Sequence, residues 1–127
     1  MKKLLLALAM VCGITLALNA APEARIQRYD SNGRPVPMGV LPTGDSYGFK
    51  AGLFGANAVA YRWDWTIVEP NGNVYTTATS PSLPFYYYFA MGGSYVVRVT
   101  VWFIDVNGNK GSVTSAPDYV EVMGGVL

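Results

Sequence analysis

The sequence has no histidine, a single cysteine and few charged residues. Its 127 residues include only 9 Lys or Arg and 8 Asp or Glu, for a formal net charge of +1. Without histidine, the commonest general acid–base group and a leading metal ligand are both absent. A near-neutral chain with no basic run also lacks the positive surface that nucleic acids require. We therefore expect a protein that is not an enzyme, with no metal, no cofactor and no nucleic-acid partner.

The first 20 residues are typical of a secretory signal peptide. Lys2 and Lys3 form a positive start, residues 4–18 are mostly apolar, and small residues follow at 19–21. This run is shorter than the roughly 20 apolar residues that a spanning helix requires. We expect residues 1–20 to be cleaved after Ala20, with cuts after residue 17 or 21 as alternatives. The mature protein is then secreted, at the cell surface or extracellular, with no stable membrane span.

The mature chain is predicted to hold together by packing alone. Cys12 lies inside the apolar run, so residues 21–127 contain no cysteine and no disulfide. Lys2 and Lys3 are removed with the signal peptide, so residues 21–127 contain seven Lys or Arg and eight Asp or Glu residues. Their net charge is therefore −1. Weak electrostatic repulsion between copies, together with 9 Tyr, 5 Phe and 3 Trp, favours association of the protein over a dispersed monomer.

The remaining sequence alternates between apolar and polar residues with a period of two, which indicates β-strands. We place one face of residues 58–68 and one face of residues 94–105 in the core. In the first segment these are Val59, Tyr61, Trp63, Trp65 and Ile67, and in the second they are Tyr95, Val97, Val99, Val101 and Phe103. The predicted structural core comprises above all Trp63, Trp65, Tyr95, Val97 and Val99.

Turn residues separate about seven predicted strands. Asn-Gly pairs occur at 32–33, 71–72 and 107–108, and Gly-Gly at 92–93. The predicted strands are 25–30, 46–54, 58–68, 73–79, 83–89, 94–105 and 112–122. Short strands at this spacing predict an all-β antiparallel sandwich. We expect a single domain over residues 21–127, in which 21–45 form an N-terminal arm with the first strand and 46–127 form the sandwich.

Two groups of side-chain oxygens are candidate chemical sites. Asp105, Asn107 and Asn109 alternate as in a calcium loop, but Lys110 and Ala116 replace the glycine and glutamate that such a loop requires. Asp64 and Glu69 are the nearest pair of carboxylates, and nothing in the sequence indicates a cleft around them. Neither group predicts a metal site or a glycosidase.

Two motifs, VAYRWDW at residues 59–65 and GSYVVRVTV at residues 93–101, precede a later Asn-Gly turn. On these features the segment from 59 to 122 resembles the PKD family of immunoglobulin-like domains. The family has a tight turn directly after its Trp-Asp-aromatic motif, whereas residues 66–68 here extend the strand, so a sibling immunoglobulin-like family fits equally well. The resemblance implies a seven-stranded sandwich with Trp63 at its centre and Tyr95 as the tyrosine of a corner motif.

If the strands holding Trp63 and Val97 are neighbours, Arg62, Asp64 and Arg98 share their outer face. Such residues form cross-strand charge pairs of about 0.2–1 kcal/mol each, without any ligand.

The aromatic run at residues 83–89 supplies the candidate binding residues. In a strand, Tyr86 and Tyr88 point away from Phe85, Tyr87 and Phe89, and two exposed rings form a platform for a sugar or a protein. Trp102, on the polar face of its own strand, extends this candidate surface.

The sequence thus predicts a structural or adhesive module that contacts itself or another extracellular protein. The alternative is a carbohydrate-binding module that stacks a polysaccharide on Tyr86, Tyr88 and Trp102.

Overall fold

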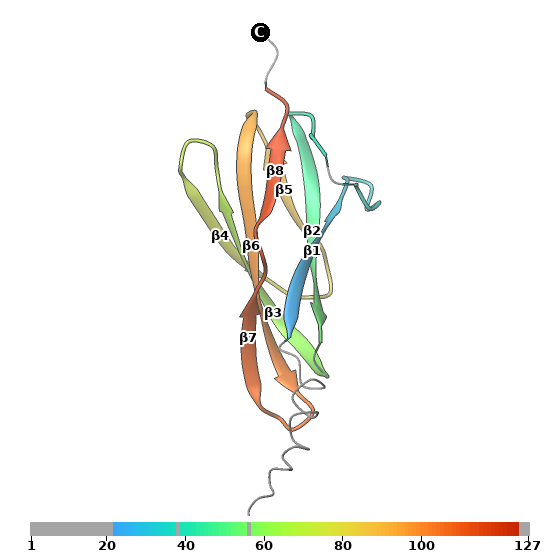
Figure 1. The fold of residues 1–127 in the computed structure, drawn as a ribbon. Helices are drawn as coiled ribbons and strands as arrows, with labels where there is room; N and C mark the ends of the chain where they lie inside the picture. Colours follow the sequence, from blue (N-terminus) through green and yellow to red (C-terminus); the bar gives the residue numbers. More distant parts are fainter. Residues whose placement is uncertain (1–21, 38, 56, 125–127) are drawn as a thin grey trace, which may run out of the picture.

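The structure is a computed structural model that describes residues 22–37, 39–55 and 57–124 of the chain. The residues of the predicted signal peptide, with Cys12, lie outside these ranges. Within them no helix is long and apolar enough to cross a membrane. Figure 1 shows the strands, which are Glu23–Tyr29 (β1), Asp45–Phe54 (β2), Ala58–Val68 (β3), Val74–Thr79 (β4), Phe85–Phe89 (β5), Gly93–Asp105 (β6), Lys110–Thr114 (β7) and Asp118–Val122 (β8).

These strands form two antiparallel sheets. The three-stranded sheet has the order β1-β2-β5, and the five-stranded sheet has the order β4-β3-β6-β7, with β8 also paired to β6. The prediction of an all-β fold with a sandwich of antiparallel sheets is thereby confirmed. The strand predicted within the N-terminal arm, β1, is an edge of the three-stranded sheet.

The core lies between the two sheets and is dominated by aromatic rings. Phe49 of β2 packs against Trp65 of β3 with ring centres 6.1 Å apart, and Phe89 of β5 meets Tyr95 of β6 edge to face at 4.8 Å. The side chains named above as structural core are each at most 3% exposed: Trp63, Trp65, Tyr95, Val97 and Val99. The Tyr95 hydroxyl also donates a 2.7 Å hydrogen bond to the carbonyl of Met91, which fixes the entry into β6.

The three Asn-Gly pairs form turns of the same construction. In each, the glycine has a left-handed backbone, with φ of 80°, 91° and 82° at positions 33, 72 and 108. Each of these glycines donates its N–H to the carbonyl three residues earlier, at Asp30, Glu69 and Asp105. A positive φ is costly for any residue with a Cβ, which accounts for glycine at all three positions.

A β-bulge changes the predicted faces at the start of β3. The register with β6 shifts between Ala60 and Arg62, so Tyr61 is an extra residue in this strand. One inserted residue reverses which side chains face the core. The core placement of Val59 and Tyr61 is therefore wrong, since they are 74% and 43% exposed, while the large residues after the bulge are buried.

The predicted strand at residues 112–122 is two strands instead of one. Both β7 and β8 pair with β6, and Ser115 joins them. The Ser115 N–H donates to the Val99 carbonyl at 2.8 Å, while its Oγ accepts the Val99 N–H at 3.1 Å. Pro117 has no N–H to donate, so the regular ladder cannot continue through it.

A buried ion pair connects the two sheets. Arg28 is on the inner face of β1, and its guanidinium donates two 3.1 Å hydrogen bonds to the carboxylate of Asp118 at the start of β8. It also donates to the carbonyls of Gly39 at 3.2 Å and Tyr119 at 3.1 Å. The side chains of Arg28 and Asp118 are 2% and 8% exposed, so this pair lies almost entirely out of water.

The stretch between β1 and β2 is pinned beside β8. Leu41 is 3% exposed. Its N–H donates to the Glu121 carbonyl at 2.9 Å, and its carbonyl accepts the Met123 N–H at 2.6 Å. The proline- and glycine-rich residues around Leu41 therefore cover the open side of β8.

We predict that Arg28→Met lowers the free energy of unfolding by about 3–5 kcal/mol, because it leaves the Asp118 carboxylate buried without its partner. The double variant Arg28→Met with Asp118→Leu should recover most of this loss, since it removes both charges. Urea unfolding of the parent and the variants measures both effects. A double variant as unstable as the single one would show that charge pairing is not what stabilises this contact.

Trp63→Ala is expected to cost about 3–5 kcal/mol, because it empties a buried site between the sheets. Thermal and urea unfolding measure the loss, with Val59→Ala as a control at an exposed position of the same strand. Unfolding of Trp63→Ala that matched the control would contradict the place of Trp63 in the core.

Candidate functional site

The outer face of the three-stranded sheet carries four aromatic side chains, Tyr29, Phe54, Tyr86 and Tyr88, which we call the aromatic face. Tyr86, Tyr88 and Phe54 are 43%, 57% and 45% exposed, and Tyr29 is half-buried. Strand alternation explains this arrangement, since the neighbours Phe85, Tyr87 and Phe89 point inward from β5. The structure therefore places Tyr86 and Tyr88 side by side on one accessible surface.

A glycine lets Tyr86 lie against the sheet. The strand register aligns Tyr29 of β1, Gly48 of β2 and Tyr86 of β5 in one row across the three strands. A Cβ built on Gly48 would lie only 2.8 Å from a ring carbon of Tyr86. The ring thus covers the glycine, and any side chain at position 48 would push it away from the sheet.

Two cations lie over rings of the same face. The guanidinium of Arg25 is 4.5 Å from the centre of the Phe54 ring, and the ammonium of Lys50 is 5.5 Å from the centre of the Tyr29 ring. Each cation covers part of one ring and places polar N–H groups beside the other aromatic side chains of this face.

Tyr87 fixes β5 so that its neighbours point outward. It lies on the inner side of β5 and donates a hydrogen bond to the carboxylate of Glu69, in the turn between β3 and β4. Burial, together with this hydrogen bond, raises the pKa of the Tyr87 hydroxyl well above its usual range. Because Tyr87 is anchored inside, Tyr86 and Tyr88 can only project to the solvent side.

Trp102 does not extend the aromatic face. It is on the outer side of β6, in the opposite sheet, and therefore faces away from Tyr86 and Tyr88. Its indole N–H donates a 2.8 Å hydrogen bond to the carboxylate of Asp64, and Arg62 donates to the same carboxylate at 2.7 Å. The prediction that Trp102 adds to one surface with the two tyrosines is wrong, because alternation within a strand cannot tell which sheet the strand joins.

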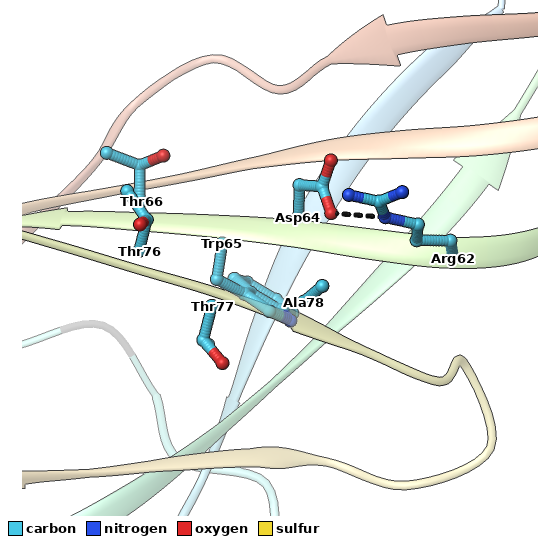
Figure 2. Close-up of a pocket in the computed structure, with 7 residues that line it drawn as sticks. All are labelled: Arg62, Asp64, Trp65, Thr66, Thr76, Thr77 and Ala78. Atoms are coloured by element: carbon cyan, nitrogen blue, oxygen red, sulfur yellow. Dashed lines mark hydrogen bonds and ion pairs between the residues drawn. The ribbon is translucent and has the colours of Figure 1, made fainter.

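A pocket of about 420 Å³ lies along β3 and β4 (Figure 2). It is lined by Arg62, Asp64, Trp65, Thr66, Thr76, Thr77 and Ala78. Figure 2 shows Arg62 and Asp64 on one side of β3, while Trp65 and Thr77 are on the other. Its two charged groups are already paired with each other, so the pocket brings no free catalytic group to a common point. The predicted outer-face charge cluster is thus the pair Arg62–Asp64, while Arg98 lies opposite Thr66.

The candidate carboxylates form hydrogen bonds within the protein. One oxygen of Asp105 accepts the backbone N–H groups of Asn107 and Asn109 at 2.8 and 3.0 Å, as a turn residue does. Asp64 is on the outer face of β3, whereas Glu69 bonds to Tyr87 of the other sheet, so the two carboxylates do not face a shared space. Within the described ranges, no group of three or more Cys, Asp or Glu residues is placed to hold a metal ion.

The aromatic face includes residues that the sequence analysis did not single out, namely Tyr29, Gly48 and Phe54. The signal that would have revealed them is in β2, where Ser46, Gly48, Lys50 and Gly52 alternate with large apolar residues. Glycine at alternate positions of a strand marks a face on which rings from neighbouring strands can lie flat. Only the register, however, shows that Tyr29 and Tyr86 lie on either side of Gly48 in one row.

A comparison with known protein families and curated proteins finds no family model and no curated protein that matches the chain.

We predict that the free energy of unfolding of Tyr87→Phe falls less steeply with rising pH in alkaline solution than that of the parent. A free tyrosine titrates near pH 10, whereas folded Tyr87 keeps its proton to higher pH. The stability that the protonated Tyr87 hydroxyl contributes is therefore present below about pH 10 and is lost as the pH rises toward the folded pKa. The parent should lose free energy of unfolding more steeply than Tyr87→Phe between about pH 9 and 11, measured by urea unfolding. Equal slopes would contradict the buried, bonded state of this hydroxyl.

Proposed function

We propose that this protein is a secreted, non-enzymatic structural and adhesive module that contacts copies of itself or another extracellular protein. It would act at the cell surface or in an extracellular filament. The observation that carries the proposal is the aromatic face, in which Tyr86 and Tyr88 are exposed on the three-stranded sheet. Tyrosine is enriched at protein interfaces because it offers a large contact area at a small cost in conformational entropy.

The charge distribution supports contact with a protein of similar character. Residues 21–127 carry a net charge of −1, and two ion pairs, Arg25–Glu23 and Arg62–Asp64, neutralise charges locally on the outer faces. Little long-range repulsion therefore opposes the approach of a second copy.

We further propose that the sandwich is of the immunoglobulin-like type, related to PKD domains, and that a signal peptide directs its secretion. Three features support the immunoglobulin-like type. The strand order divides β1, β2 and β5 from β3, β4, β6 and β7. Trp63 is buried on β3, and the hydroxyl of Tyr95 bonds back to Met91 at the start of β6.

Carbohydrate binding is the second candidate function. It is favoured by one observation, the exposed Tyr86 ring, which covers Gly48 and lies against the sheet. Flat exposed rings stack on the apolar faces of sugars. Trp102 plays no part in this version, because it belongs to the other sheet.

The test removes the two most prominent rings. We predict that the parent associates as its concentration rises and that Tyr86→Ala with Tyr88→Ala reduces this association, measured by sedimentation velocity over a concentration series. Because both side chains are largely exposed, the double variant should unfold within about 1 kcal/mol of the parent. The matched control is Tyr61→Ala with Tyr119→Ala, which removes two exposed tyrosines from the five-stranded sheet and should leave association unchanged.

A parent that sediments as a monomer at every concentration would contradict self-assembly. Affinity electrophoresis in gels that contain soluble polysaccharides then tests the second candidate, with the same two double variants. Retardation that depends on Tyr86 and Tyr88 supports carbohydrate binding, and unaltered mobility in every gel excludes it for the polysaccharides used.

A further inference from the structure

The strand β4 forms an edge of the five-stranded sheet and has no protection along that edge. It pairs with β3 on one side, and Figure 1 shows no strand beside its other side. Its sequence is Val-Tyr-Thr-Thr-Ala-Thr, with no charged residue, no proline and no glycine. Natural proteins guard exposed edges with charges, prolines or bulges, because a bare edge pairs with other strands.

The turn before β4 determines which backbone groups are free. The Glu69 N–H donates to the Asn73 carbonyl, and the next pair along the hairpin is Val68 with Val74. Hydrogen-bonded and non-hydrogen-bonded pairs alternate in an antiparallel ladder. The N–H and C=O groups of Val74, Thr76 and Ala78 therefore point away from β3, toward the open edge.

The other edges of the two sheets are shorter, carry charges or are covered. At β1, Arg25 pairs with Glu23 on the strand itself, and Arg28 is held by Asp118. The edge strand β5 has only five residues, and the β3–β4 hairpin contacts its inner side, where Tyr75 stacks on Phe85 with ring centres 6.2 Å apart. The free side of β8 is covered by Leu41.

The last edge, β7, has only five residues and begins at Lys110. Among the described strands, β4 is thus the longest edge strand that has no charged residue, no proline and no glycine.

We propose that β4 pairs antiparallel with β4 of a second copy of this chain, about a two-fold axis at Thr76. This pairing deepens the proposed function and rests on its self-assembling form. In this register Thr76 lies opposite its own copy, and Val74 lies opposite Ala78. The three outward-facing residues of each strand would exchange about six backbone hydrogen bonds.

The side chains favour a second copy as the occupant. The three residues whose backbone groups pair, Val74, Thr76 and Ala78, are small or β-branched, so they fit opposite one another on a pleated surface. The pair Thr76–Thr76 would repeat a contact already present in this sheet, where the hydroxyls of Thr100 and Thr114 lie 2.8 Å apart across two strands. With no charge on the strand, the pairing brings no like charges together.

Cross-linking tests the register directly. In the full-length chain with Cys12→Ser, Thr76→Cys leaves a single thiol at the proposed axis, where paired Cα atoms about 5.5 Å apart are within disulfide range. Mild oxidation should give a disulfide-linked dimer that forms at least ten times faster than with the matched control Ser112→Cys on the edge strand β7. Equal rates for the two variants would overturn the proposal.

A charge substitution separates this inference from the proposed function. Thr76→Lys places two ammonium groups opposite each other and should remove the β4 contact, while Ser112→Lys adds the same charge elsewhere and should not. Sedimentation compares both with the parent and with Tyr86→Ala/Tyr88→Ala, and circular dichroism verifies folding. If Thr76→Lys associates like the parent, the β4 contact is wrong; if only the tyrosine variant loses association, the proposed function survives. If only Thr76→Lys loses it, the β4 contact stands and the aromatic face is not the contact surface.

Discussion

The buried contact between Arg28 and Asp118 connects the two sheets where β1 lies beside β8, and the closure of the sandwich on this side depends on it. It joins residues 90 positions apart, on edge strands of opposite sheets. A guanidinium buried in a mostly aromatic interior is tolerable only when every side of it is bonded, and the carboxylate and two carbonyls meet that requirement. The same bonds bring β1, the residues around Gly39 and the start of β8 to one place, which closes this side of the sandwich.

Few of the described charged side chains on the outer surfaces lack a nearby partner. The remaining acids and bases are largely engaged locally, in turns or in pairs along one strand. What remains accessible is a face of aromatic rings on the three-stranded sheet and an uncharged strand edge on the five-stranded sheet. The first offers side-chain surface and the second offers main-chain hydrogen bonds. A copy with two distinct contact surfaces would join more than one neighbour, as a filament requires.

Much of the fold could be predicted from local patterns. Six of the seven predicted strands agree with observed strands within about two residues, because alternation and Asn-Gly turns act over short distances. Two features were missed although their signals are local: the bulge at Tyr61, which inverted the face of Val59, and the interruption at Pro117. Both add residues to one strand of a pair, and a period of two cannot register such an insertion.

The candidate site could be predicted only in part, since it depends on register between strands. The outward direction of Tyr86 and Tyr88 follows from alternation alone. Which strands share a sheet determines that both lie away from Trp102 and that Tyr86 shares a row with Gly48 and Tyr29. Long-range pairing of this kind arises from contacts such as Arg28 with Asp118, which no local window of sequence contains.

Amide hydrogen exchange over a range of protein concentrations tests most directly whether two copies of this protein pair through β4. The outward N–H groups of Val74, Thr76 and Ala78 should exchange rapidly in dilute solution and become protected as concentration rises. The N–H groups of Thr77 and Thr79, which bond to β3, should be protected throughout. Exchange at the three outward positions that stayed rapid and independent of concentration would contradict the account.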